Sequence, residues 1–385
     1  MAVRRLALTE FRGYARLALE LDPEPVVLTG PNGAGKTNLL EAVSYLAPGR
    51  GLRGAALPDA LRRGAAADAR WAVSATLDTV SAAGPERVRI GTGMDPDAPI
   101  DQPRRVVRLD GRAAASQAEL GERVALVWLT PALDRLFTEG ASGRRRFLDR
   151  LVAGFFPAHA RHAAAYERAM RERARLLRDG RQDPGWLGAL EDAMATNGVA
   201  LAAARREVVA RLQAAAAAAT LADGPFPAAD IAIAGTVEDG LAGAPALAVE
   251  DDLRARLRDA RRYDAAAGGA SAGPHRADLE VRHRAKDMPA AQCSTGEQKA
   301  LLIGLVLANA RLLAAERGAP PLLLLDEVAA HLDRHRRDAL YAEILALGAQ
   351  AWLTGTDAGL FDGFGDRARR FRVEDARVTE TPGTD

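Results

Sequence analysis

A glycine-rich stretch near the N-terminus constrains this chain more than any other feature. Residues 30–37 read GPNGAGKT, which fits the pattern G-x-x-x-x-G-K-[ST] of a phosphate-binding P-loop. The apolar run 25–29 before it predicts a short buried strand, and the run 37–46 after it predicts a helix without a breaker. Because a strand, a glycine turn and a helix N-terminus are what such a loop needs, a chance glycine-rich turn is the weaker interpretation.

Each residue type in this loop has a chemical use. Glycines let backbone N–H groups approach a phosphate without an intervening Cβ, and the helix dipole favours the anion. Lys36 is expected to reach the β- and γ-phosphates of ATP, and the Thr37 hydroxyl is expected to hold Mg²⁺. The predicted ATP-binding residues here are Gly30, Pro31, Asn32, Gly33, Ala34, Gly35, Lys36 and Thr37.

A second stretch supplies two carboxylates. Residues 321–327 read PLLLLDE, an apolar strand that ends in an acidic pair. In an ATPase, Asp326 would hold Mg²⁺ through water, and Glu327 would polarise the attacking water as the general base. Taken alone, the pattern is equally a buried strand followed by an acidic helix cap. The P-loop upstream favours the ATPase interpretation.

Composition bounds what the chain binds and where it works. Its 385 residues, 48% of them hydrophobic, suffice for one large domain or two ordinary ones. A net charge of +1 predicts no strong overall attraction to DNA or membranes, so any DNA binding must use a local patch. The single Cys293, the absence of a secretory start and the absence of a long apolar run predict a cytoplasmic protein with no membrane partner. The histidines and the cysteine show no metal-site spacing, so Mg²⁺ on ATP is the one metal expected.

The residue pattern changes along the chain. Strand-like runs at 3–8, 15–21, 71–77, 88–90 and 105–109 predict an antiparallel sheet, with an exposed loop over much of 84–103. Residues 131–219 are helical in pattern, with breaks at 183–185 and 197–198, and are too interrupted for a long coiled coil. The predicted parts are 1–130 and 270–378 for an ATPase head, 131–269 for a helical insertion lobe, and 379–385 for a flexible tail.

A second anion site is predicted before the acidic strand. Residues 293–299 read CSTGEQK and precede an apolar helix over 300–313, so a serine and a glycine stand at a helix N-terminus. Ser294 with Glu297 is also a capping box, and the two interpretations are compatible. The stretch is close to the S-G-G-Q signature of ABC-type ATPases, which binds the γ-phosphate held by a partner subunit. That resemblance adds Ser294, Gly296 and, at the D-loop position, Asp333 to the ATP-binding set.

The order P-loop, long insertion, signature, acidic strand and D-loop resembles the ABC ATPases of chromosome maintenance, and more narrowly the RecF family. The stretches that carry the closer match are LALTEFRGY (6–14), Asn38 after the P-loop, GRGLR (49–53), GRRRFLD (143–149) and GPHRADL (273–279). The resemblance implies an α/β fold, namely an ABC-type P-loop ATPase head with an antiparallel β subdomain and an inserted compact helical lobe. It also adds Asn38 to the ATP-binding residues. Thr356 stands where ABC transporters usually have a histidine, which leaves a histidine switch in question.

The same resemblance implies a function. Members of the family are expected to be ATP-dependent DNA-binding clamps of recombinational repair and replication-fork maintenance, active in the response to DNA damage. ATP and Mg²⁺ would bridge a head-to-head homodimer, and slow, DNA-stimulated hydrolysis would open it. The expected partners are DNA near gaps or single-strand/duplex junctions, with RecR and RecO, in loading the recombinase RecA.

Two other functions stay open at this point. One is the ATP-binding subunit of an ABC transporter, which the long insertion disfavours and which co-purification with a membrane protein would support. The other is a structural or nuclease-coupled SMC-like ATPase, and the nuclease alternative would need a further acidic metal cluster.

DNA contacts are the least specific prediction. Arg144, Arg145 and Arg146 form the densest basic run, although a solvated helix face or pairing with Asp149 explains them equally well. Alternative contacts are arginines at 12, 50 and 53, the last of which could instead touch the nucleotide. His275, which has no nucleophile or metal partner in the pattern, is expected to be structural or to form an interface.

Overall fold

The computed structural model describes residues 1–81, 84–99, 101–116, 118–180, 183–219 and 225–381. The chain forms two compact units. The first contains Met1–Asp134 and Leu302–Asp385, and the second contains Arg135–Leu301.

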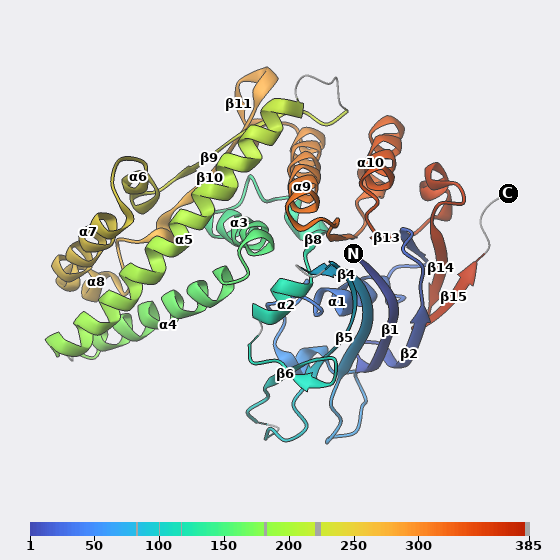
Figure 1. Cartoon of the computed structure of the whole chain (residues 1–385), viewed down its shortest axis with the longest axis horizontal. Coiled ribbons are helices and arrows are strands. Elements are labelled where there is room, and N and C mark those ends of the chain that lie inside the picture. Colours follow the sequence, from blue (N-terminus) through green and yellow to red (C-terminus); the bar gives the residue numbers. More distant parts are fainter. Residues whose placement is uncertain (82–83, 100, 117, 181–182, 220–224, 382–385) are drawn as a thin grey trace. The chain divides into compact units, whose positions relative to one another are not determined.

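An antiparallel sheet forms one layer of the first unit (Figure 1). Its strands, in spatial order, are β2 (Tyr14–Glu20), β1 (Ala2–Phe11), β4 (Ala72–Ser81), β5 (Gly84–Met94), β6 (Arg105–Leu109) and β7 (Arg112–Ala113). Alternating burial along β4 and β5 gives the sheet one core face. The predicted antiparallel subdomain is therefore confirmed. The predicted loop at 84–103 begins later than expected, because residues 84–93 of β5 pair with β4.

A mixed sheet forms the second layer of this unit. Its order is β15 (Arg377–Thr381), β14 (Arg369–Glu374), β3 (Val26–Thr29), β13 (Ala351–Gly355), β12 (Leu322–Leu325) and β8 (Leu126–Leu129). The strands from β14 to β8 are parallel, and every residue of β3, β12 and β13 is buried. Continuous burial is typical of a parallel sheet covered on both faces. Strands β3, β13 and β12 are parallel neighbours in that order. The carboxyl ends of β3, which precedes the P-loop, and of β12, which precedes the acidic pair, therefore lie at the same edge of the sheet.

Helix α1 (Lys36–Ser44) contributes to the core shared by the two sheets. Tyr45, directly after it, contacts the rings of Phe11 and Trp71 at centroid distances of 5.9 and 4.9 Å. The unit also contains α2 (Ala118–Arg123) and α10 (Arg334–Leu347). This packing fixes α1, and therefore the P-loop, against both sheets.

Helix α9 (Thr295–Arg317) begins in the second unit and ends in the first. Among the described helices it is the one whose length and apolar composition would allow it to cross a bilayer. Its apolar window is 67% buried inside the protein, as in the core helix of a soluble domain.

The second unit is mainly helical. It contains α3 (Ala141–Phe155), α4 (His159–Arg178), α5 (Pro184–Ala219), α6 (Thr236–Gly243), α7 (Ala246–Asp259) and α8 (Arg261–Ala267). A small sheet of β11 (Met288–Pro289), β10 (Asp278–His283) and β9 (Ala229–Ala234) completes it.

Helix α5 runs through the break predicted at 197–198. A Cβ on Gly198 would lie 3.1 Å from the Tyr166 side chain and 3.2 Å from that of Pro274, so this glycine serves close packing. The Asn197 amide donates to the Ala193 carbonyl at 2.8 Å, which keeps the asparagine compatible with the helix. Tertiary packing thus outweighs the weak helix propensity of the pair.

The units also differ from the predicted segment bounds. Residues 270–301 belong to the second unit, because β10 pairs with β9 along its whole length and contacts α3. Of the predicted tail, residues 379–381 are part of β15, and 382–385 lie outside the described residues.

Candidate nucleotide-binding site

The P-loop follows β3 and is packed on one side. A Cβ at Gly30 would lie 2.1 Å from the Val373 carbonyl oxygen, and one at Gly35 would lie 2.7 Å from the Tyr14 hydroxyl. Both glycines have positive φ, 142° and 112°, as does Gly33 at 81°. No atom lies within 4 Å of a Cβ placed on Gly33, so space is open above the loop there. A phosphate can approach the backbone from that open side.

The N-terminus of α1 supplies the electrostatics. Its N-cap, Gly35, has no side chain to accept from the first N–H groups, and no acidic residue lies in the first turn. The positive end of the helix dipole is therefore left for an anion. The Lys36 ammonium donates to the carbonyls of Gly30 and Pro31 at 2.6 and 2.9 Å. Burial lowers the pKa of Lys36, while the charges of Glu327 and Asp326 act in the opposite direction.

Asp326 joins the two halves of the predicted ATPase motif. Its Oδ1 accepts a hydrogen bond from the Thr37 hydroxyl at 2.9 Å and another from the Thr354 hydroxyl at 2.7 Å. A hydroxyl oxygen and a carboxylate are the hard oxygen donors that Mg²⁺ prefers, so this pair fits the predicted ion. Thr37 and Asp326 would hold it, and the ion would neutralise phosphate charge.

Glu327 has an unusual backbone conformation. It is partly buried, and its φ of 53° lies in the left-handed region, which costs a non-glycine residue about 1–2 kcal/mol. The Glu327 N–H donates to the Thr354 hydroxyl at 2.9 Å. Such strain is typically held at functional sites by the surrounding structure. The sequence drew attention to Thr356, which is exposed, and missed Thr354, whose signal is a hydroxyl within an otherwise apolar strand.

Glu41 is a second residue that the sequence did not single out. It is fully buried in α1 and accepts from Arg12 at 2.8 and 2.6 Å and from Arg53 at 2.6 Å. Burial opposes the charge of Arg12, but the hydrogen bond and charge of Glu41 outweigh it and raise the pKa of Arg12. Arg53 also donates to the Asn38 side chain at 2.8 Å. Arg12 and Arg53, two of the three alternative DNA-contact residues, are therefore paired with Glu41 of α1. The third, Arg50, is exposed.

The signature stretch lies in the second unit and caps α9. The Ser294 hydroxyl donates to Glu297 Oε2 at 2.9 Å, and the Ser294 N–H donates to the same oxygen at 3.0 Å. Lys286 pairs with Glu297 and, together with these bonds, lowers the pKa of Glu297 to about 2. Ser294 and Gly296 remain exposed, and no atom lies within 4 Å of a Cβ placed on Gly296. The cap is thus ordered, and the Ser294 hydroxyl and N–H are bonded to Glu297 although the residue itself is exposed.

Asp333 is the N-cap of α10. Its Oδ1 accepts from the Arg336 N–H at 2.9 Å, and the residue is exposed. The second carboxylate oxygen, Oδ2, lies 3.8 Å from the Arg336 Nε, so Arg336 contacts both oxygens of this cap.

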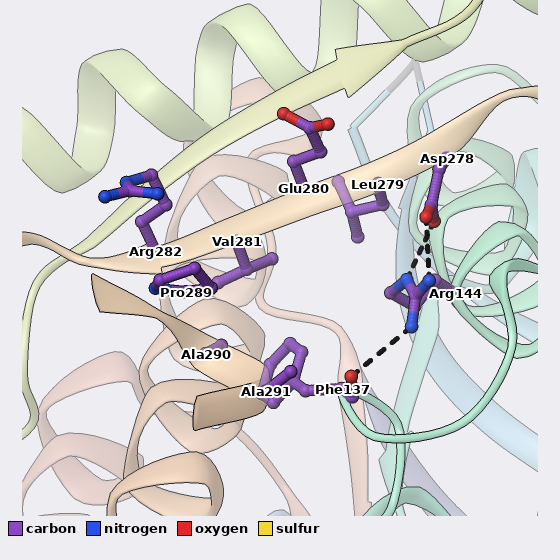
Figure 2. A pocket seen from close by; sticks show the side chains of 10 residues that line it. All are labelled: Phe137, Arg144, Asp278, Leu279, Glu280, Val281, Arg282, Pro289, Ala290 and Ala291. Carbon is purple, nitrogen blue, oxygen red and sulfur yellow. Dashed lines mark hydrogen bonds and ion pairs between the residues drawn. The ribbon is translucent and has the colours of Figure 1, made fainter. Parts of the chain in front are cut away.

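The arginine run at 144–146 has three different environments. Arg144 donates twice to the Asp278 carboxylate, at 2.7 Å each, and also to the Phe137 carbonyl (Figure 2). Arg145 donates to the Ala277 carbonyl at 2.7 Å. Arg146 is exposed. The first two arginines therefore tie α3 to the start of β10, and the DNA contact of this run stays a prediction.

A network of polar groups around the buried Arg205 connects the same two stretches. Asp149 accepts from Arg205 at 2.7 and 2.9 Å and pairs with His159, so it is not the partner of the arginine run. Arg205 also donates to the Pro274 carbonyl at 2.7 Å. We call the set Arg144, Arg145, Asp149, Arg205, His275 and Asp278 the α3–β10 joint.

His275 has a structural role in this joint. Its Nε2 lies 2.8 Å from the Ala270 carbonyl oxygen and must donate to it, which leaves Nδ1 to accept from the Tyr166 hydroxyl at 2.6 Å. Burial lowers the pKa of His275, consistent with a neutral ring. These contacts explain the GPHRADL stretch without a catalytic role.

A cavity of about 300 Å³ lies beside the Arg144–Asp278 pair. Its other walls include Phe137, Leu279, Val281, Pro289 and Ala291 (Figure 2). The cavity is outside the P-loop cluster, by which we mean residues 30–37 together with Asp326, Glu327 and Thr354. Within the part of the chain that the structure describes, no group of three or more histidine, cysteine or acidic side chains is placed to hold a metal ion.

A P-loop and an acidic pair at one edge of a parallel sheet, together with an antiparallel sheet, define an ABC-type ATPase head of the SMC-like class. A family model described as "RecF/RecN/SMC N terminal domain" matches residues 2–376. Two curated relatives are named "DNA replication and repair protein RecF": one from Rhizobium etli, 51% identical over 378 residues, and one from Agrobacterium fabrum, 50% identical over 384 residues. Each alignment covers 98% of both chains. The chain belongs to the RecF family.

Solved structures show the same fold. One, described as the "recombination mediator protein RecF-ATPrS in RecFOR pathway", has a TM-score of 0.83 at 21% identity and covers 99% of this chain and 98% of its own. The Smc head domain from Pyrococcus furiosus has a TM-score of 0.52 at 15% identity, with 99% and 96% covered. The predicted fold class is confirmed.

Proposed function

We propose that this protein is an ATP-dependent DNA-binding clamp that acts in recombinational repair and replication-fork maintenance. The proposal is supported by two helix N-termini of different kinds, each of which suits an anion. One is the P-loop with its acidic pair, and the other is the exposed cap at Ser294 and Gly296. The second has no P-loop of its own, so it suits a nucleotide held by another subunit.

ATP would then hold two copies together. Lys36, Mg²⁺ and the two helix N-termini would neutralise the phosphates. Gly30 to Asn38 would bind the nucleotide on one chain, and Ser294, Gly296 and Asp333 would complete the site from the other. Hydrolysis would remove the γ-phosphate and with it the link between subunits.

Residues of this chain would carry the chemistry. Thr37 and Asp326 would hold Mg²⁺, which supplies charge neutralisation when bound. Glu327 would accept a proton from the attacking water as the general base. We expect slow hydrolysis that DNA stimulates, because the nucleotide serves as a switch rather than as fuel for movement.

The proposed partners follow from the family. The relatives are named for DNA replication and repair, and one solved neighbour is described within the RecFOR pathway. We therefore propose gapped or junction DNA, RecR and RecO as partners in the cytoplasm, with loading of the recombinase as the outcome. Within the basic run, Arg146 is the exposed member and the best placed to contact a phosphate.

The decisive experiment uses Glu327→Gln, which removes the base but keeps a side chain of the same size. Mass in solution is measured with and without ATP-Mg²⁺, and binding to gapped DNA is measured under the same conditions. We expect ATP to double the mass and to increase DNA affinity, because the bound nucleotide is no longer consumed.

Ser294→Arg in the same background is the matched variant. It places a bulky side chain at the cap and should abolish the ATP-dependent doubling while each chain still binds ATP. A protein that binds ATP yet stays monomeric and indifferent to DNA would overturn the clamp proposal.

A further inference from the structure

Thr354 lies at the centre of the P-loop cluster although no motif includes it. It belongs to β13, the strand between β3 and β12, and is 1% exposed. Its position in the sheet brings its hydroxyl beside the carboxyl end of β12, where Asp326 and Glu327 follow.

The hydroxyl of Thr354 makes two hydrogen bonds of opposite direction. It donates its hydrogen to Asp326 Oδ1 at 2.7 Å and accepts the Glu327 N–H at 2.9 Å. A hydroxyl has one hydrogen and two lone pairs, so one side chain contacts both members of the acidic pair. A methyl group at the same position could make neither bond.

The Glu327 N–H that bonds to Thr354 belongs to the residue with the strained backbone. Glu327 has a φ of 53°, and the direction of its side chain follows from that backbone conformation. The Thr354 bond holds the N–H of the same residue. Because Glu327 is partly exposed, its backbone has room to relax if the bond is lost.

We propose that Thr354 is a positioning residue for ATP hydrolysis. Its hydroxyl holds the Glu327 backbone in the left-handed conformation and so sets where the general base lies relative to the attacking water. The same hydroxyl fixes the rotamer of Asp326. This inference rests on the proposed ATPase function.

The test compares Thr354→Val, which keeps the shape and removes the hydroxyl, with Thr354→Ser, which keeps the hydroxyl. kcat and KM for ATP, ATP affinity by equilibrium binding and the unfolding temperature are measured for both. Thr79→Val is the matched control, because Thr79 is a buried threonine of β4 whose hydroxyl donates to the Arg123 carbonyl at 2.8 Å.

We expect Thr354→Val to lower kcat by about tenfold to a hundredfold, the usual consequence of a misplaced catalytic group, and to change KM and ATP affinity by less than about threefold. Its unfolding temperature should fall no further than that of Thr79→Val. Thr354→Ser should restore kcat to within about threefold of wild type.

Wild-type kcat in Thr354→Val, or equally low kcat in Thr354→Ser, would overturn the inference. If Thr354→Val does not fold, Thr354→Ala is compared with Thr354→Ser, and equal kcat in that pair would overturn it as well. A wild-type protein that binds ATP but never hydrolyses it would instead count against the proposed function.

Discussion

The P-loop cluster and the α3–β10 joint are both built from conspicuous sequence motifs, yet they use their polar groups in opposite ways. In the joint, arginines and carboxylates are bound to one another and to backbone carbonyls, as Arg205 is to Asp149 and Pro274. In the P-loop cluster, side chains such as Lys36 and Asp326 are also hydrogen-bonded, but the N-terminus of α1 remains open to a ligand. The first turn of α1 has no side-chain cap, and space is open above Gly33.

This difference separates a structural motif from a binding motif. A structural motif satisfies its own hydrogen-bond donors and acceptors, so its loss lowers the free energy of unfolding. A binding motif keeps donors in reserve for a ligand, and its loss is felt as weaker binding. Sequence alone could not show whether the arginine run at 144–146 is bonded within the protein or open to a ligand, because its partners are distant along the chain.

The largest expected effect is on stability in the joint. Arg205→Met leaves Glu238, whose side chain is 1% exposed, without its cationic neighbour, and it removes two hydrogen bonds from Asp149. Breaking a buried ion pair in this way costs about 3–5 kcal/mol. Urea unfolding should show this loss, whereas ATP affinity of the folded protein should stay unchanged. Arg206→Met is the neighbouring control, and a similar loss in that variant would contradict the assignment.

The next effect lies in the P-loop cluster and has the opposite character. Lys36→Met should weaken ATP binding by at least about thirtyfold, since a buried charge partner contributes about 2–5 kcal/mol. The free energy of unfolding should change by less than about 1 kcal/mol, because an apolar chain of similar length avoids the cost of burying an ammonium. Equilibrium binding measures the ATP affinity, and urea unfolding measures the free energy of unfolding. A large loss of stability in Lys36→Met would contradict the distinction between the P-loop cluster and the α3–β10 joint.

The smallest effect is a pH dependence in the joint. Burial opposes ionisation of Asp149, but hydrogen bonds from His159 and Arg205 lower its pKa to about 2. A carboxyl whose folded pKa is depressed stabilises the protein above its unfolded pKa of about 4 and loses that contribution as the pH falls toward 2. The amount is on the order of 2 kcal/mol.

Asp149→Asn tests this prediction because an amide does not titrate. Unfolding free energy is measured between pH 6 and pH 3 for both proteins. The variant should have a shallower decline below pH 4, whatever its absolute stability. Parallel curves would mean that other carboxylates account for the acid sensitivity.

The parts of the fold that the sequence predicted correctly are those whose signals are local. The P-loop, the buried acidic strand and the alternating strands of the antiparallel sheet each follow from spacing and period within a short window. The capping box at Ser294 followed from a spacing of three residues, and its hydrogen bonds are present.

The features that were missed depend on contacts between distant parts of the chain. Thr354 and Glu41 gain their significance from partners on other elements, at Asp326 and Arg12, and no local pattern marks them. The continuity of α5 through Gly198 depends likewise on packing against Tyr166. The pairing of Arg144 with Asp278 joins residues 134 positions apart, so the arginine run could not be distinguished from an exposed one.

The strand order of the mixed sheet determines when, during translation, the nucleotide site can form. Val26 of β3 pairs with Trp352 of β13 and Arg369 of β14, so the P-loop strand gains both neighbours only when the chain is nearly complete. At a translation rate of about 5–20 residues per second, β3 waits on the order of twenty seconds to a minute on the ribosome. The Ala376 N–H, which donates to Ala34 of the loop, arrives later still. A nascent chain therefore acquires its nucleotide site at the end of translation, and a prematurely ended chain never does.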